Sequence, residues 1–389
     1  MNIALCYENV NPARGGCETY IADLTRRLVA DGHDVHLYAC QWDAAALPRE
    51  LTCHKLTAPR GPRFLRPWQF GHACLRELHR NDHDVSVGFD KTWGQDVLYP
   101  QGGLHAASAD HNIRKHPSGW LRFLARAAKQ FDPAARSFRR LEQRQYLGPD
   151  RPIVVVNSDM VRAHFRQYYG IPSDRIHVVH AAIDPNRFHA SDRLKIRQEW
   201  RCRWGIAPDD TVALFVAMNY RLKGLEPLLH AVGLVPDGIP FRLIVVGHPR
   251  TSRYERLARR LGISDRVVFH GFSAETRNAY FAADFLVHPT FYDPCSLVAL
   301  EALACGLPVV TTRYNGASEL LDPPHDGLVI DDPHDHPCLA ECLVKMFDRD
   351  YRANASRAAR ETASRWTFEL HYRRMIEVFR DVAARKAAA

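Results

Sequence analysis

The chain has 389 residues, of which 46% are apolar and 25% are charged. This composition is ordinary for a globular protein and excludes a disordered chain, and the length suggests two domains that each bury a core. Basic residues outnumber acidic ones by 52 to 44, a net charge of +8, which favours an anionic partner. A membrane surface, a phosphorylated substrate and a nucleic acid all fit that charge.

Two features of the sequence predict a cytoplasmic protein. No apolar run approaches the ~20 residues that span a bilayer. The first residues, MNIALCYEN, lack the basic region and the long apolar run of a signal peptide. The ten cysteines are scattered through apolar patterns, as expected for reduced, buried thiols.

The first half of the chain alternates short apolar runs with amphipathic helices. A strand is predicted over residues 2–7, a turn at Gly15-Gly16, and a helix over 18–31 that Gly32 stops. Further strands are predicted over residues 34–38, 85–88 and 153–157. This βαβ alternation indicates a parallel, doubly wound sheet.

The second half repeats the pattern. Strands are predicted over 212–217, 242–247, 267–270, 285–288 and 308–312, with a helix over 254–261. Residues 182–204 are polar and irregular and are interpreted as the linker. Residues 367–384 predict one helix. The predicted domains are residues 1–183, completed by the C-terminal helix 367–389, and residues 184–366.

Doubly wound sheets bind ligands beyond the carboxyl ends of their strands, so a nucleotide would suit either domain. A nicotinamide-binding domain is the obvious competitor. Its G-x-G-x-x-G fingerprint is absent after the first strand, where the sequence reads NPARGG. This absence disfavours a dehydrogenase.

The segment 293–310, DPCSLVALEALACGLPVV, predicts a helix that binds an anion. Asp293 has the character of an N-cap and Pro294 that of a first helical residue, while Gly306 ends the helix. The helix N-terminus offers free amides and partial positive charge to a diphosphate. Glu301, about two turns in, has the acceptor oxygens to bind both ribose hydroxyls. The alternatives are pure capping by Asp293 and a surface position for Glu301.

This segment resembles the E-x7-E region of family 4 retaining glycosyltransferases with the GT-B fold, an α/β architecture of two doubly wound Rossmann-like domains facing across a cleft. Asp293 stands where the family has Glu. The resemblance implies that Asp293 contacts the donor sugar and that Glu301 contacts the ribose. It also implies that Ser296, Leu297 and Val298 bind the donor at the helix start. Residues 1–183 would bind the acceptor and residues 184–366 the nucleotide sugar.

Other motifs match the family in order. The loop GGCETY resembles its glycine-rich loop, which implies that Gly15 and Gly16 lie against donor phosphates and acceptor. The turn NYRLKG implies that Arg221 and Lys223 neutralise the diphosphate, although the family arginine would fall at Met218. The strand end FHGFS implies that Gly271 and Phe272 contact the base. His105 would lie near the acceptor, with Asp96 and His111 as nearby candidates.

Within the family, LYACQWD, VGFDKTWGQDV and NYRLKG are most similar to the branch of lipopolysaccharide core glucosyltransferase I. This resemblance implies transfer of glucose from UDP-glucose, with retention, onto a lipopolysaccharide core or lipid-linked saccharide. It implies no metal and no cofactor besides the nucleotide-sugar donor. A sugar-nucleotide epimerase and a non-catalytic basic surface-binding protein on the same fold stay open as alternatives.

Residues 120–147 form a basic amphipathic stretch that suits an anionic bilayer surface. The same stretch matches the membrane-associated region of the glucosyltransferase branch, which implies peripheral attachment to the inner face of the cytoplasmic membrane. Helices packed on the first domain with a solvated basic face are the alternative. No nucleic-acid-binding motif accompanies the stretch, so no nucleic-acid partner is expected. The His and Cys residues of 332–342 lack the spacing of a standard zinc site.

Overall fold

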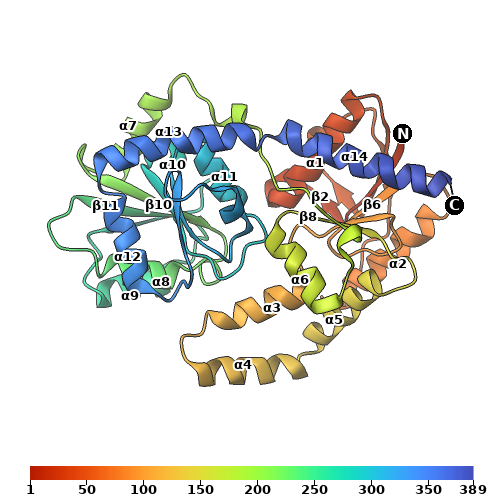
Figure 1. Cartoon of the computed structure of the whole chain (residues 1–389), viewed down its shortest axis with the longest axis horizontal. Helices are drawn as coiled ribbons and strands as arrows, with labels where there is room; N and C mark the ends of the chain where they lie inside the picture. The colour runs from red at the N-terminus through yellow and green to blue at the C-terminus, as the bar shows by residue number, and fades with distance from the viewer. Residues whose placement is uncertain (389) are drawn as a thin grey trace. The chain divides into compact units, whose positions relative to one another are not determined.

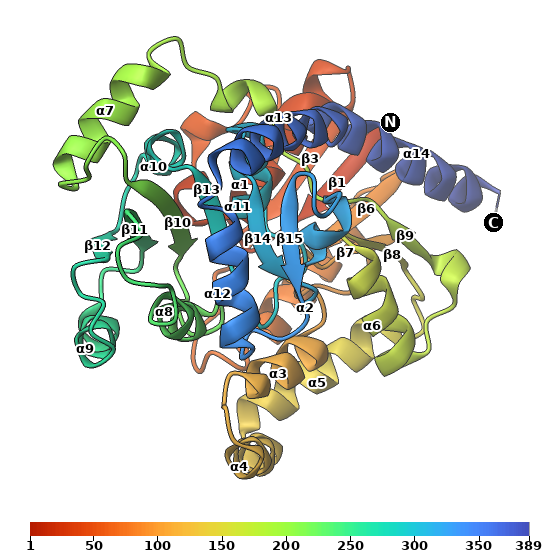
Figure 2. The ribbon, with the colours of Figure 1, turned by 60° about the vertical axis from the view of Figure 1, so that its left-hand side comes forward.

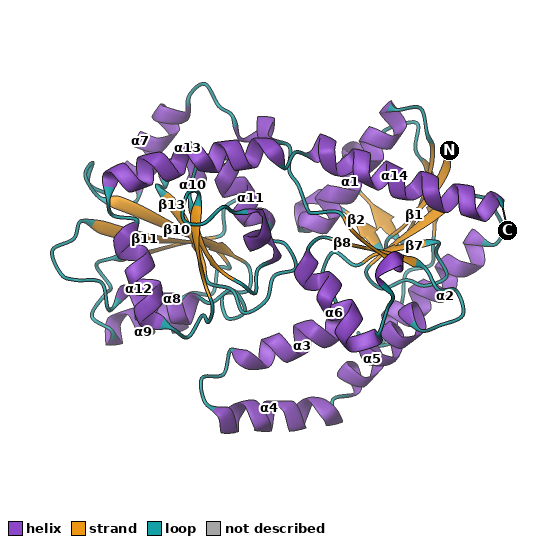
Figure 3. Ribbon diagram, viewed as in Figure 1, coloured by secondary structure: helices purple, strands orange, loops and turns teal. Residues whose placement is uncertain are grey.

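The computed structural model describes residues 1–388, and the chain divides into two compact units (Figure 1). Unit 1 contains Met1–Asp110, Ser118–His180 and Leu370–Ala389, and unit 2 contains His111–Pro117 and Ala181–Glu369. Each unit is built around a parallel sheet with helices on its faces, as the purple helices and orange strands of Figure 3 show. The predicted α/β class is therefore confirmed.

Unit 1 has a seven-stranded parallel sheet in the order β5-β3-β1-β6-β7-β8-β9. β1 is central and pairs with β3 on one side and β6 on the other. The sheet is wound outward in both directions from β1, so its topological switch point lies between β1 and β6. Its strands are β1 (Asn2–Cys6), β3 (Asp34–Ala39), β5 (Thr52–Lys55), β6 (Val85–Phe89), β7 (Val97–Tyr99), β8 (Ile153–Val156) and β9 (Ile176–Val178). A separate pair joins β2 (Asn9–Val10) to β4 (Gln41–Trp42).

The helices of unit 1 follow its strands in chain order. The predicted basic stretch divides into two helices, because Asp132 caps the second one and Pro133 occupies its first position. α3 begins in unit 1 and ends in the segment that belongs to unit 2. These helices are α1 (Gly16–Ala30), α2 (Arg66–Leu78), α3 (His105–Arg114), α4 (Gly119–Phe131), α5 (Pro133–Tyr146), α6 (Asp159–Tyr169) and α14 (Phe368–Ala387).

Unit 2 has a six-stranded parallel sheet in the order β12-β11-β10-β13-β14-β15, seen with its covering helix α12 in Figure 2. The switch point lies between β10 and β13. Its strands are β10 (Thr211–Ala217), β11 (Phe241–Gly247), β12 (Val267–Gly271), β13 (Phe285–His288), β14 (Val309–Thr312) and β15 (Gly327–Ile330). Its helices are α7 (Arg193–Arg203), α8 (Leu225–Val232), α9 (Ser252–Arg260), α10 (Thr276–Ala282), α11 (Leu297–Ala304), α12 (His336–Lys345) and α13 (Arg349–Arg365).

The central strand of unit 2 shows why the sheet is covered on both faces. Alternate residues of β10 enter two different cores: Val212 and Leu214 join one, and Ala213 and Phe215 join the other. A strand buried on both faces reads as a continuous apolar run, which is how residues 212–217 predicted it.

The interpretation of residues 182–204 as an irregular linker is wrong in its second half. Residues Arg193–Arg203 form α7, whose Ile196 and Trp200 are buried in the unit 2 core. Four arginines and two further charged residues dilute the apolar signal of this helix, so its helical period is not apparent in the sequence. None of the helices in residues 1–388 is long and apolar enough to cross a bilayer.

The helix α14 is held to unit 1 by a buried hydrogen-bonded histidine. His371 Nδ1 lies 2.7 Å from the carbonyl oxygen of His180, which only accepts, so Nδ1 carries the proton. Nε2 then accepts from the hydroxyl of Tyr20 at 2.8 Å. Burial lowers the pKa of His371 to about 4. The neutral imidazole is therefore the form that the fold requires.

This histidine makes unit 1 sensitive to acid. The folded pKa of about 4 lies below the ordinary value of 6.5, so its contribution is complete above pH 6.5 and is lost as pH falls toward 4. The loss is on the order of 3 kcal/mol. In urea titrations between pH 7 and 4, the His371→Gln protein should lose less free energy of unfolding on acidification than the wild type. The exposed His189→Gln should follow the wild type; an identical pH slope for all three proteins would contradict this role.

Candidate functional site

The candidate site of unit 2 lies at the carboxyl ends of β10 and β13, beside the switch point. The turn 218–224 follows β10, and the loop 289–296 follows β13. Lys223 Nζ from the turn lies 2.5 Å from Asp293 Oδ2 of the loop and 3.3 Å from the carbonyl oxygen of Tyr292. Strand ends at a switch point are where open α/β sheets bind ligands. The structure thus joins two of the predicted site residues directly.

Gly224 allows the turn and the loop to approach this closely. Its φ is 81°, and a Cβ added there would lie 2.0 Å from the carbonyl oxygen of Pro289. Any side chain would therefore push the turn away from the loop. The two segments are also joined by the amide of Phe291, which donates to the carbonyl of Leu222 at 2.9 Å.

Asp293 is charged and does not cap the helix. Burial by itself would raise the pKa of its carboxyl, but Lys223 and the neighbouring His288 outweigh burial and hold that pKa well below its usual range. His288 is 1% exposed, and its Nε2 lies 3.5 Å from Asp293 Oδ2. Burial lowers the pKa of His288 itself, so the charged partner of Asp293 is Lys223.

The prediction that Asp293 and Pro294 begin the helix is wrong. α11 begins at Leu297, and its N-cap is Ser296. Asp293 instead forms a bridge with Asn315: its amide donates to the carbonyl of Tyr314 at 2.9 Å, and its carbonyl accepts from Gly316. These backbone bonds and the ion pair outweigh the local preference of Asp-Pro for a helix start.

The N-terminus of α11 is open to an anion. The amide of Ser296 donates to Asn315 Oδ1 at 3.1 Å, which fixes the helix start. The amides of Leu297 and Val298 fall in the first turn, where a helix has no internal acceptor for its N–H groups. The predicted Ser296–Leu297–Val298 segment therefore does form a helix start, and the helix dipole adds partial positive charge there.

Glu301 is the fifth residue of α11, one turn rather than two from its beginning. The hydroxyl of Tyr280 donates to Glu301 Oε2 at 2.7 Å. Burial raises the pKa of Glu301, and the Tyr280 bond opposes that effect. Glu301 is only partly exposed and has a dedicated hydrogen-bond partner, so the surface-helix alternative is wrong.

The remaining donor-side predictions are placed as follows. Gly271 ends β12 with a φ of 78° and has open space around its α-carbon, and the next residue, Phe272, is 64% exposed. Arg221 lies in the same turn as Lys223, but its Nη2 contacts His116 Nδ1 at 3.3 Å. Met218 is exposed at 59%.

The segment His111–Pro117 belongs to unit 2, which the sequence did not indicate. His111 Nδ1 lies 3.2 Å from the carbonyl oxygen of Phe291, and its ring lies 5.1 Å from that of Tyr292. Arg114 Nη1 donates to the hydroxyl of Tyr314 at 2.6 Å. The sequence predicts His111 near the acceptor. It gives no signal for His116, because only the fold brings that side chain beside Arg221.

In unit 1, the glycine loop and His105 each begin a helix. Gly15 is the N-cap of α1, and Gly16 is its first residue. His105 is the first residue of α3, where its amide donates to Glu142 and its ring lies 4.8 Å from that of Phe138. Burial lowers the pKa of His105, and Lys91 and Lys129 lower it further. His105 is thus a neutral imidazole at neutral pH.

The interpretation of Asp96 as a candidate beside His105 is wrong. Asp96 precedes β7, so it lies at the amino-terminal edge of the sheet. Its Oδ2 accepts from the amide and the hydroxyl of Ser86 at 2.8 and 2.7 Å and pairs with Lys386 at 3.1 Å. Its role is to connect two strands and α14.

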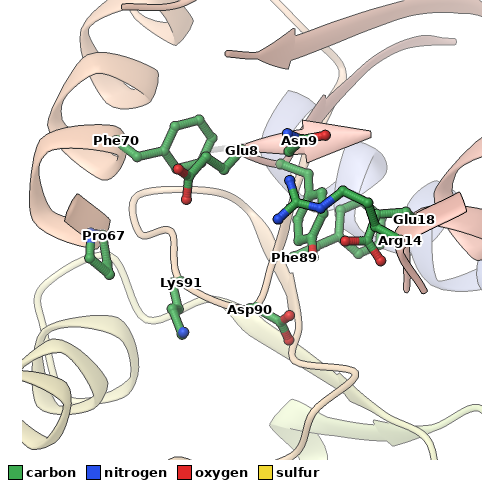
Figure 4. A pocket seen from close by; sticks show the side chains of 10 residues that line it. Glu8, Asn9, Arg14, Glu18, Pro67, Phe70, Phe89, Asp90 and Lys91 are labelled. Atoms are coloured by element: carbon green, nitrogen blue, oxygen red, sulfur yellow. The ribbon is translucent and has the colours of Figure 1, made fainter. Parts of the chain in front are cut away.

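Unit 1 has a pocket that the sequence analysis missed (Figure 4). Tyr7 and Glu8 follow β1, and Asp90 and Lys91 follow β6, so the pocket lies at the switch point of the sheet. Figure 4 shows Arg14 and Glu18 together on one side, Glu8 beside Phe70, and Lys91 between Pro67 and Asp90. The sequence signal for this pocket is VGFDK, in which Asp90 and Lys91 directly follow an apolar strand.

Asp90 has an unusual backbone in this pocket. Its φ is 55°, which a residue other than glycine rarely adopts. Its Oδ1 accepts from the amide of Gly102 at 3.3 Å, and burial raises the pKa of its carboxyl. Strained residues of this kind gather at functional sites, which supports this pocket as a candidate site of unit 1.

Both halves of the chain match family models of glycosyltransferases. Residues 14–187 match the model of Glycosyltransferase Family 4, and residues 196–362 match that of Glycosyl transferases group 1. The lipopolysaccharide glucosyltransferase WaaG of Escherichia coli (strain K12) is 24% identical over 349 residues, 89% of this chain and 90% of that protein. A D-inositol 3-phosphate glycosyltransferase of Xylanimonas cellulosilytica is 28% identical over 96% of this chain and 93% of its own.

Solved structures show the same fold. The crystal structure of WaaG matches with a TM-score of 0.74 at 23% identity, covering 93% of this chain and 95% of that one. Anabaena Alr3699/HepE in complex with UDP matches with a TM-score of 0.67 at 20% identity, over 98% and 100% of the two chains. The chain is therefore a glycosyltransferase of the GT-B fold, whose two halves belong to Glycosyltransferase Family 4 and Glycosyl transferases group 1.

Proposed function

We propose that this glycosyltransferase moves glucose from UDP-glucose, with retention, onto a lipopolysaccharide core or lipid-linked saccharide. The observation that carries the proposal is the set of groups at the carboxyl edge of unit 2: the Lys223–Asp293 pair, the open start of α11 and Glu301. The similarity to a lipopolysaccharide glucosyltransferase over 89% of the chain supports the choice of sugar and acceptor.

In this proposal the protein binds the donor through charged side chains and through backbone amides. Lys223, Arg221 and the first turn of α11 neutralise the diphosphate, while Glu301 accepts from the ribose hydroxyls. Gly271 and Phe272 contact the base, and Asp293 contacts the sugar. With that much positive charge from the protein, no metal and no additional cofactor is required.

The chemical step follows from retention. The bond between glucose C1 and the diphosphate oxygen breaks, and the acceptor oxygen bonds to C1 on the same face. The departing diphosphate oxygen takes the acceptor proton, so UDP and the glucoside are the products. The protein orients the two substrates and stabilises the leaving charge through Lys223 and Arg221.

The acceptor side belongs to unit 1. Gly15 and Gly16 allow close approach of backbone to ligand, and His105 begins the helix that follows the β7 loop. The pocket of Glu8, Asp90 and Lys91 offers both acceptors and a donor to sugar hydroxyls. Such mixed polar groups suit a saccharide.

The helix α4 supports attachment to an anionic membrane on the cytoplasmic side. Figures 1 and 2 show it beside α3 and α5 and away from the sheet of unit 1. None of its residues is buried, and Trp120, Phe123 and Phe131 are 65%, 72% and 74% exposed. Basic residues are spread along α4 and α5: Arg122, Arg126, Lys129, Arg136, Arg139, Arg140 and Arg144. Aromatic area with surrounding basic charge is the pattern of an interfacial helix.

The proposed reaction is tested with a panel of nucleotide sugars, with and without a heptose-containing core acceptor. UDP release should require both UDP-glucose and the acceptor, and NMR of the product should show an α-glucoside. Release that ignores the acceptor would favour hydrolysis or epimerisation instead. Failure to bind any nucleotide sugar in a thermal-shift screen would contradict the donor assignment as a whole.

Replacement of Glu301 by Ala should weaken UDP binding by about 10² or more, because two charged hydrogen bonds to the ribose are lost. Isothermal titration measures this effect. Glu301→Gln, which keeps an acceptor for Tyr280, separates loss of the ribose contacts from loss of support for Tyr280. Glu341→Ala, on the exposed face of α12, is the matched control. Normal UDP affinity in Glu301→Ala would show that the ribose assignment is wrong.

Replacing Trp120 and Phe123 by Ser should lower binding to phosphatidylglycerol vesicles by about 10² to 10³, since burial of each aromatic side chain contributes about 2 kcal/mol. Co-sedimentation measures the bound fraction. Leu234→Ser with Val344→Ser removes exposed apolar area from unit 2 and should bind as the wild type does. Equal binding by both double variants would count against α4 as the attachment surface.

A further inference from the structure

A pocket in unit 2, away from the donor groups, is lined by five arginines. We call it the arginine pocket: Arg193 and Arg197 come from α7, and Arg349, Arg352 and Arg360 come from α13. Both helices pack on the same face of the unit 2 sheet, against one hydrophobic core (Figure 1). The arginine stems line the pocket between them.

The arginine pocket lies at the opposite edge of the sheet from the donor site. Its floor includes Ala283 and Asp284, which precede β13, and Gly306 and Leu307, which precede β14. Lys223 and Asp293 follow their strands instead. A ligand in this pocket is therefore distinct from the donor diphosphate.

The charges of the pocket are not balanced by the protein. Asp284 is the single carboxylate among its described lining residues, and it is already bound by Arg197 at 2.5 Å and by Arg201 at 2.6 Å. Arg352 Nη1 donates to the carbonyl of Met346 at 2.7 Å.

Three guanidinium groups have no such partner. Within residues 1–388, Arg193, Arg349 and Arg360 make no hydrogen bond or ion pair with a protein acceptor. Arg193 instead lies over the ring of Phe281, with its Cζ 5.3 Å from the ring centroid. Burial lowers the pKa of Arg193, and the nearby charges of Arg360 and Arg197 lower it further. These like charges repel one another where they stand.

The guanidinium of Arg360 is positioned by its packing against Gly306. The guanidinium of Arg360 lies across Gly306, where an added Cβ would come within 2.5 Å of Arg360 Nε. Ser356 Oγ donates to the carbonyl of Gly306 at 2.6 Å, which fixes α13 against this turn. The absence of a side chain at residue 306 thus leaves room for the arginine.

We propose that the arginine pocket is a binding site for a phosphate group separate from the donor nucleotide. Guanidinium forks match phosphate oxygens in pairs, and several converging guanidiniums favour a multiply charged oxyanion over a single carboxylate. The phosphate belongs either to a soluble anion or to a lipid headgroup, and the experiment separates these sources.

The test compares the wild type with Arg193→Ala/Arg360→Ala and with Arg259→Ala/Arg260→Ala. The second pair removes the same charge from the exposed end of α9. Two probes are used: pyrophosphate by isothermal titration with excess UDP present, and phosphatidylglycerol vesicles by co-sedimentation. Thermal unfolding confirms that each variant is folded. Loss of Arg193 and Arg360 should weaken binding by roughly tenfold or more for each guanidinium.

Each outcome either supports or overturns the proposed phosphate site. Pyrophosphate binding that is lost only in the Arg193/Arg360 variant supports a soluble phosphate ligand. With Trp120→Ser/Phe123→Ser added to all three proteins so that α4 does not mask the effect, vesicle binding that is weakened only by loss of Arg193 and Arg360, without pyrophosphate binding, supports a headgroup. Equal binding by all three proteins, equal losses in both variants, or no binding of either probe by the wild type overturns the proposal.

Discussion

The ion pair between Lys223 and Asp293 is the interaction on which the proposed donor site depends. It joins the turn after β10 to the loop after β13 and so closes the switch point of the unit 2 sheet. Both side chains are largely buried, and breaking one partner of a buried pair typically costs 3–5 kcal/mol. Gly224 makes the approach possible, and the position of α11, with Glu301 on it, follows from the loop that Asp293 anchors.

The two units share one arrangement of strands, a parallel sheet with a switch point beside its first strand. In each, a central strand is flanked by the next strand on one side and by a later one on the other, and polar groups gather where the winding reverses. Unit 2 places Lys223 and Asp293 there, and unit 1 places Glu8, Asp90 and Lys91. A glycosyltransferase needs a site for a charged donor and a site for a polyhydroxyl acceptor, and the contrasting charges of the two edges suit those two ligands.

Folding distributes the basic residues behind the net charge of +8 over separate places in the structure. Part of it lies at the donor edge in Lys223 and Arg221, part on the exposed surface of α4 and α5, and part in the arginine pocket of unit 2. These places differ in what surrounds the charge. Backbone amides lie beside it at α11, exposed aromatic side chains lie beside it on α4, and the turn at Gly306 lies beside it in the arginine pocket, so the three places would suit different anionic ligands.

The sequence alone determined the strands, their order with the helices and the family motifs, because these depend on residues close together in the chain. It placed Glu301 on a helix but could not supply Tyr280, and it took Asp293 for a cap because Asp-Pro usually begins a helix. Only the tertiary structure decided that Asp293 pairs with a lysine 70 residues away, that His116 meets Arg221, and that arginines of α7 and α13 line one pocket. Those contacts arise from packing across the sheet, which no local pattern records.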